Sequence, residues 1–221
     1  MKDLNSNIKK NIKSHTYQGM PLCLGERKQP IEMRILYLDK IIRVVENAID
    51  QYPRALMLRV ELRFPQEILY DGEGVIKRFI ESLRSQVDAD IKRKRKNGKK
   101  TPNCSIRYVW AKERDTSINH HYHVGLFFNK DVYYWPGKFD NESNLVYKIK
   151  RAWCSALNFD MDEGDGLVEF PKNYKYTLDR NKKIVMSRLT WFSNALAILL
   201  KLKQKSMAIE HEVLATHCCR I

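Results

Sequence analysis

The chain has 221 residues, with 40 Lys and Arg against 26 Asp and Glu, which gives a formal net charge of +14. This length suffices for a full hydrophobic core. Without a long apolar segment or an apolar stretch near its start, the chain is expected to be cytoplasmic, with no membrane association and no signal peptide. The five cysteines show no paired spacing, which argues against a disulfide framework. The positive charge favours a nucleic acid or another anionic partner, the alternative being a basic protein with a solvated surface.

The first 52 residues are predicted to form an N-terminal arm followed by a helix. Residues 1–30 are polar and rich in lysine, with scattered glycine and proline, as is typical of an irregular segment. From Ile31 the apolar residues recur at helical spacing until Tyr52-Pro53. We expect this arm and helix to precede a separate domain at 53–190.

That domain begins with a strand and a helix. The segment "ALMLRVELRF" (55–64) alternates with a period of two, which indicates a strand that Pro65 ends. Apolar residues from about Gly74 to Lys94 then follow a helical spacing. This helix continues into "IKRKRKNGKK" (91–100), where Asn97-Gly98 marks a turn. For this basic run a solvated loop is favoured over a specific phosphate clamp.

The remaining elements complete a recurring pattern. Strands are expected at 105–113, 121–129 and 166–170, and a helix at about 144–157. The order from 55 to 170 is then β-α-β-β-α-β. This order predicts an α+β fold of the ferredoxin-like type, an antiparallel sheet with helices on one face and the other face open. Residues 191–221 form the C-terminal segment, in which "WFSNALAILLKLK" predicts a C-terminal helix.

Strand alternation predicts which side chains share the open face. In "HYHVGLFFN" (121–129) the apolar residues alternate with His121 and His123, so both imidazoles should point away from the core. The same reasoning applies to the charged residues of the first two strands. The predicted open face carries His121, His123, Glu113, Glu61, Arg59, Arg63 and Arg107.

This constellation suggests a divalent-metal site. Two imidazoles in a His-x-His strand lie about 7 Å apart and can ligate one ion. Glu113 would supply a third, oxygen ligand, with Glu61 as an alternative that could instead pair with its neighbouring arginines. Mg²⁺ or Mn²⁺ held in this way would keep free coordination positions and could polarise a phosphate. Basic residues would contact neighbouring phosphates, and those assigned to DNA binding are Arg59, Arg63, Arg107 and Lys112.

Several segments resemble the YagK/YfjJ-like prophage proteins, which are related to the replication initiators of filamentous phages (inoviruses). The segments are "RYVWAKERDTSINHHYHVGLFFNKDVYY", "KIKRAWCSALNF", "GLVEFP" and "YTLDRN", and the resemblance covers about residues 31 to 190. It implies the ferredoxin-like fold of the HUH (Rep-like) endonucleases and rolling-circle initiation of DNA replication. A metal held by His121, His123 and Glu113 would then assist a tyrosine that nicks single-stranded origin DNA, with host replication proteins as further partners.

The C-terminal segment departs from this family pattern. The family continues into a helix that carries the nucleophile in a Tyr-x-x-Lys arrangement, whereas no tyrosine follows Tyr176 here. Permitted codons for residues 192–215, read one nucleotide earlier, can spell a Tyr-Ile-Ala-Lys motif, which suggests a frameshift near residues 189–192. The remaining candidates, Tyr174 and Tyr176, fit a structural role better than catalysis. Nicking is therefore expected to be impaired in this copy.

Two other functions stay open as alternatives. The first is a non-catalytic DNA-binding prophage protein, which would use the same basic face to hold single strands. The second is an RNA-binding ferredoxin-like module, which is disfavoured because the predicted open face carries histidines and arginines instead of exposed aromatics.

Overall fold

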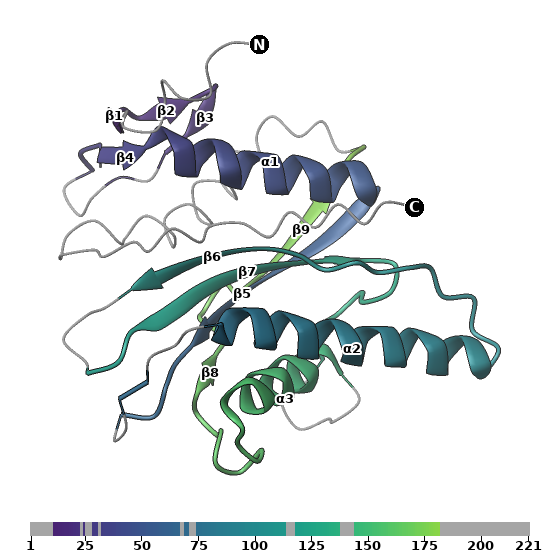
Figure 1. Ribbon diagram of the computed structural model, residues 1–221. Helices are drawn as coiled ribbons and strands as arrows, with labels where there is room; N and C mark the ends of the chain where they lie inside the picture. Colours follow the sequence, from purple (N-terminus) through teal and green to yellow (C-terminus); the bar gives the residue numbers. More distant parts are fainter. Residues whose placement is uncertain are drawn as a thin grey trace.

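The computed structural model describes residues 11–22, 24, 28–30, 32–66, 69–70, 74–113, 118–137 and 144–181. Over these residues the chain is a mixed α+β protein with antiparallel sheets and three helices, which confirms the α+β part of the predicted fold class (Figure 1). None of these helices is long and apolar enough to cross a membrane. The predicted C-terminal helix and the frameshift hypothesis concern residues outside the described part.

The N-terminal region is more regular than the sequence suggested. Its residues form two small antiparallel ladders, in which β1 (Asn11–Lys13) pairs with β4 (Glu32–Arg34), and β2 (Thr16–Tyr17) pairs with β3 (Met20–Pro21). The expected irregular arm is therefore wrong for these residues. The helix predicted after it is present as α1 (Ile35–Gln51).

The central sheet has five strands, and every pairing between them is antiparallel. Its order is β6 (Arg107–Glu113), β7 (His121–Asn129), β5 (Arg54–Leu62), and then both β8 (Val168–Glu169) and β9 (Lys175–Asp179) along the far edge of β5. Strand β9 was not predicted. Apart from it, the elements from β5 to β8 follow the expected order along the chain.

Helices α2 (Val75–Lys96) and α3 (Leu145–Leu157) cover one face of the sheet (Figure 1). Each has an apolar stripe that packs on the alternating apolar residues of β5 and β7, as helical and strand periodicity require. The stripe of α2 includes Phe79 and Leu83, and α3 contributes the fully buried Trp153. The indole Nε1–H of Trp153 donates to the carbonyl of Arg63 at 2.8 Å, which fixes α3 against the end of β5.

Helix α1 lies on the other face of the sheet, which the sequence analysis had left open (Figure 1). Its apolar side packs on one half of that face, formed by Ala55, Met57, Val109, Phe127 and Leu178. The expectation of an open face is therefore wrong for this half, and the sheet has helices on both sides. The histidines of β7 lie at the opposite end of the same face, because His123 pairs with Glu61, four residues beyond Met57 on β5.

Candidate metal centre

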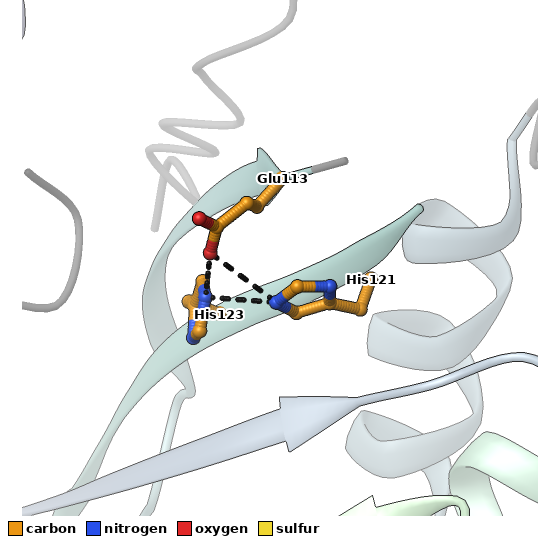
Figure 2. A group of neighbouring side chains, drawn as sticks. All are labelled: Glu113, His121 and His123. Carbon is orange, nitrogen blue, oxygen red and sulfur yellow. Dashed lines mark hydrogen bonds and ion pairs between the residues drawn. The ribbon is translucent and has the colours of Figure 1, made fainter. Parts of the chain in front are cut away.

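Three side chains from the paired strands β6 and β7 converge at one end of the sheet. The strand register places Glu113 directly opposite His121, and His123 follows two residues later on the same face. His123 Nε2 lies 3.1 Å from His121 Nε2 and 2.7 Å from Glu113 Oε2, and the third side of this triangle, from His121 Nε2 to Glu113 Oε2, measures 3.3 Å (Figure 2). The sequence prediction that these three residues lie together thus agrees with the structure.

The spacing of these atoms suits a divalent cation. Ligands at right angles around an ion, each about 2.1 Å away, lie about 3.0 Å from one another. The observed separations of 2.7, 3.1 and 3.3 Å are close to that value. Two imidazole nitrogens and one carboxylate oxygen on one side of an ion leave the remaining positions for water or substrate. The three residues therefore fit the predicted metal, and they form a group of His and acidic side chains able to hold one ion.

The residues before β7 hold the two histidines in place. Asn119 is buried; its Nδ2 donates to the carbonyl of Pro65 at 2.6 Å, and its Oδ1 accepts from the backbone N–H of Tyr70 at 3.0 Å. His120, also buried, has its Nε2 3.1 Å from the hydroxyl of Tyr122. His120 therefore faces the core that α2 and α3 cover, beside Phe64, while the residues on either side of Tyr122 point to the opposite face. Alternation thus assigns the three neighbouring histidines to different roles.

Glu61 on β5 lies behind His123 rather than with the three converging atoms. Its Oε1 is 3.4 Å from Nδ1 of His123, an ion-pair contact longer than an ordinary hydrogen bond. That nitrogen makes no closer hydrogen bond among the described residues. Metal-binding histidines usually have a carboxylate on the nitrogen that does not bind the metal, because it orients the ring and raises its basicity. Glu61, predicted as an alternative ligand, occupies this supporting position.

Two arginines hold the carboxylate of Glu61. Arg59 reaches its Oε1 at 2.9 Å, and Arg63 reaches its Oε2 at 3.0 Å. The contact with His123 and the charges of both arginines lower the pKa of Glu61 to about 2, against the opposing effect of burial. The carboxylate is therefore ionised throughout the physiological range. Arg63 also binds Glu169 on β8 at 3.0 Å, a partner that the sequence analysis did not name.

The environment of His121 favours the neutral ring that a metal requires. Burial and the neighbouring His123 lower the pKa of His121 below its usual value of 6.5, and the nearby Glu113 opposes this only in part. His121 is therefore uncharged near neutral pH and available as a ligand.

The four residues predicted to bind DNA are not all brought together. Arg59 and Arg63 lie at the candidate metal centre, where both bind Glu61. Arg107 lies at the far end of β6, where its Nε donates to Gln51 at the end of α1 at 2.8 Å. Lys112 pairs with the core residue Tyr122, so alternation directs its side chain to the opposite face from Glu113.

The two candidate tyrosines lie on opposite faces of the sheet. Tyr176 pairs with Met57 and packs beside the α1 cluster, on the face that carries the histidines. Burial raises the pKa of Tyr176, and the charge of Arg59 opposes this shift. Tyr174 packs on the other side, against Phe170 and the core beneath α2 and α3. Of the two, only Tyr176 shares a face with the candidate metal centre.

Comparison with known proteins identifies relatives over most of the chain. A family model described as the YagK/YfjJ C-terminal domain matches residues 15–213. The "Uncharacterized protein YagK" of Escherichia coli (strain K12) is 37% identical over 179 residues, covering 76% of this chain and 86% of that protein. The "Uncharacterized protein YfjJ" of the same organism is 30% identical over 182 residues, covering 77% of this chain and 88% of that protein. No solved structure gives a significant match.

Proposed function

Because this chain belongs to the YagK/YfjJ C-terminal domain family, and its relatives' names state no activity, we propose a function from the geometry of its own site. The chain is a metal-dependent, single-stranded-DNA-binding protein of the HUH replication-initiator type, with nicking activity impaired in this copy. The observation that carries the proposal is the convergence of His121 Nε2, His123 Nε2 and Glu113 Oε2 within 3.3 Å of one another.

The fold supports the same proposal. Numbered along the chain from β5, the first four strands of the central sheet have the spatial order two, three, one, four, with every neighbour antiparallel. We take this order as support for the split β-α-β, or ferredoxin-like, fold. In that fold the first and third strands lie side by side at the centre, which here brings Glu61 of β5 against His123 of β7.

Each residue of the site then has a distinct task. His121, His123 and Glu113 would hold Mg²⁺ or Mn²⁺, which would supply charge stabilisation at a phosphodiester when bound. Glu61 orients His123, and Arg59 and Arg63 hold Glu61. In a nicking reaction, a tyrosine hydroxyl oxygen attacks the phosphorus and the bond from phosphorus to the 3′ oxygen breaks. The protein becomes linked to the 5′ phosphate, and the leaving 3′ oxygen takes up a proton.

The nucleophile is the weak element of this chain. Tyr176 shares the face of the metal centre, but its raised pKa opposes ionisation, and no tyrosine follows it in the sequence. These two observations favour the second candidate function, a DNA-binding protein that does not cut. Binding of metal and of single strands is common to both functions, and only the covalent step separates them.

The test uses Mn²⁺ titration followed by incubation with single-stranded DNA. We expect one Mn²⁺ per chain by calorimetry, lost in the His121→Ala, His123→Ala double variant and retained in His15→Ala, which removes an exposed histidine elsewhere. Absence of Mn²⁺ binding, or binding that the double variant leaves unchanged, would refute the metal centre.

A pool of labelled single-stranded oligonucleotides then tests the covalent step. We expect little or no protein–DNA adduct that survives boiling in detergent. A strong Mn²⁺-dependent adduct that Tyr176→Phe abolishes would show that this copy is an active nickase and overturn the impairment. DNA binding without any adduct would favour the non-catalytic function.

A further inference from the structure

The loop between β7 and α3 exposes two neighbouring aromatic side chains. Tyr134 is 74% exposed and Trp135 is 57% exposed, whereas the other Phe, Tyr and Trp residues that the structure describes are buried or partly buried. Adjacent exposed rings of this size are unusual on a protein surface and often mark a binding site.

This loop is held firmly at both ends. Tyr133, only 5% exposed, donates its hydroxyl to the buried Asp90 on α2 at 3.0 Å, and Lys94 lies 4.5 Å above its ring. At the other end, the carbonyl of Pro136 accepts from the backbone N–H groups of Leu145 and Val146 at 3.0 and 3.1 Å. The two exposed rings are therefore presented by a fixed segment, which lowers the entropic cost of binding.

Gly137, two residues after Trp135, reinforces this arrangement. Gly137 has a φ of +101°, and a Cβ at this position would lie 2.3 Å from side-chain atoms of Asn144. Only glycine fits so close to that side chain. Asn144 in turn caps α3 by accepting from the backbone N–H of Tyr147 at 3.0 Å. The end of the exposed loop and the beginning of α3 are thus locked together.

Lysines accompany both exposed rings. Lys175 Nζ lies 3.0 Å from the centre of the Trp135 ring, and Lys130 Nζ lies 5.2 Å from the centre of the Tyr134 ring. Lys130 also donates to Thr177 Oγ1 at 2.7 Å, which ties this group to β9. Nearby, α2 ends in the basic residues Arg93 to Lys96, and Lys94 contacts Tyr133 beside the two exposed rings.

We propose that Tyr134, Trp135, Lys130 and Lys175 form a second contact surface for single-stranded DNA. The rings stack on bases, and the lysines contact the adjoining phosphates. Aromatic platforms flanked by positive charge are the recurring means of binding single strands without sequence preference. A protein partner fits this surface less well, because lysine is depleted in protein–protein interfaces. The choice of DNA rests on the proposed function, whereas the preference for a single strand rests on these contacts.

This surface is distinct from the metal centre. Lys175 and Thr177 pair with Leu58 and Leu56 of β5, whose side chains face α2 and α3. Glu61 and His123 lie on the opposite face of the sheet. DNA binding here therefore requires no metal.

The test measures binding of a fluorescent 20-nucleotide oligo-dT to the full chain in EDTA, by anisotropy at several salt concentrations. We expect Tyr134→Ala, Trp135→Ala to weaken binding by about 30-fold or more, the change that corresponds to the loss of two stacking rings. Trp135→Leu should weaken binding and Trp135→Phe should restore it to within about threefold, because only the second keeps a ring. Leu69→Ala, which truncates another exposed apolar side chain, should leave it unchanged.

The outcomes separate this surface from the metal centre. Unchanged affinity in the double variant, or no binding by the wild type in EDTA, overturns the second surface. If Trp135→Leu binds as well as Trp135→Phe, stacking is refuted too. A change of oligomeric state in the double variant with unchanged DNA affinity would assign the rings to a protein interface. Ring-dependent binding without any Mn²⁺ site would support this surface while refuting the proposed metal-dependent function.

Discussion

Replacing Glu61 by glutamine tests the contacts that support the proposed metal centre, in the protein without metal. Glu61 is 8% exposed and lies between two arginines and His123. These contacts lower its pKa from the ordinary value of 4.5 to about 2. Each tenfold change in proton affinity corresponds to about 1.4 kcal/mol, so the ionised carboxylate contributes up to about 3 kcal/mol to the free energy of unfolding at pH 7.

The pH dependence of this contribution has a defined sign. Because the pKa of Glu61 is lower in the folded chain, its contribution is fully present above the unfolded value of 4.5 and is lost as the pH falls toward 2. At pH 3 about 1 kcal/mol should remain. We therefore expect Glu61→Gln to cost up to about 3 kcal/mol at pH 7 and clearly less at pH 3.

Urea unfolding followed by circular dichroism, in EDTA and at pH 7, 5, 4 and 3, measures this difference. Glu169→Gln is the matched control, because Glu169 binds the same Arg63 but its side chain is 51% exposed. Exposed ion pairs contribute under about 1 kcal/mol, so this variant should lose little at any pH. Equal losses in the two variants, or a loss for Glu61→Gln that does not change with pH, would refute the reasoning.

Three further results follow from the contacts described. Asn144→Ala should lower the free energy of unfolding by about 1 kcal/mol in a urea titration, because it removes the side-chain cap of α3, whereas Asn144→Ser should retain most of it. Burial raises the pKa of Cys104 to about 12, so iodoacetamide at pH 8 should leave this thiol unmodified until urea unfolds the chain. Peptide mass spectrometry would measure the labelling, and rapid labelling of the folded protein would contradict the burial of Cys104. The imidazole protons of His121 should titrate below pH 6.5 in an NMR experiment without metal, and a midpoint above 6.5 would disprove the neutral ring.

Local sequence patterns predicted most of the secondary structure and the centre of the site. Alternation placed His121, His123 and Glu113 on one face, because a strand directs every second side chain to the same side and the short connection between β6 and β7 implies a hairpin. The register then needed to align only Glu113 with His121 to bring the three ligand atoms together. This part of the prediction depended on residues close in sequence.

The remaining features depend on contacts between distant segments. The apolar stripe of α1 showed that this helix must bury one side, but periodicity does not indicate which surface it covers. It packs on the face of the sheet that was expected to be open. Strand β9 was missed because "KYTLD" is short and only partly apolar, and it becomes a strand by pairing with the edge of β5. Arg107 was expected to face DNA because the packing of α1 on this face was not foreseen. Its partner, Gln51, belongs to α1.

The charges at the proposed metal centre indicate how the proposed DNA binding there should depend on metal. Arg59 and Arg63 were predicted to contact phosphates, but both bind Glu61, and Arg63 also binds Glu169. Metal binding requires both imidazoles to be neutral. The carboxylates of Glu61, Glu113 and Glu169 then place three negative charges against the two positive charges of Arg59 and Arg63. This end of the sheet is then net negative and repels phosphate, whereas a divalent cation reverses the sign and attracts it. We therefore expect Mn²⁺ to strengthen the binding of single-stranded DNA to the wild type but not to the His121→Ala, His123→Ala variant. The binding that remains in EDTA should be the part that depends on Tyr134 and Trp135.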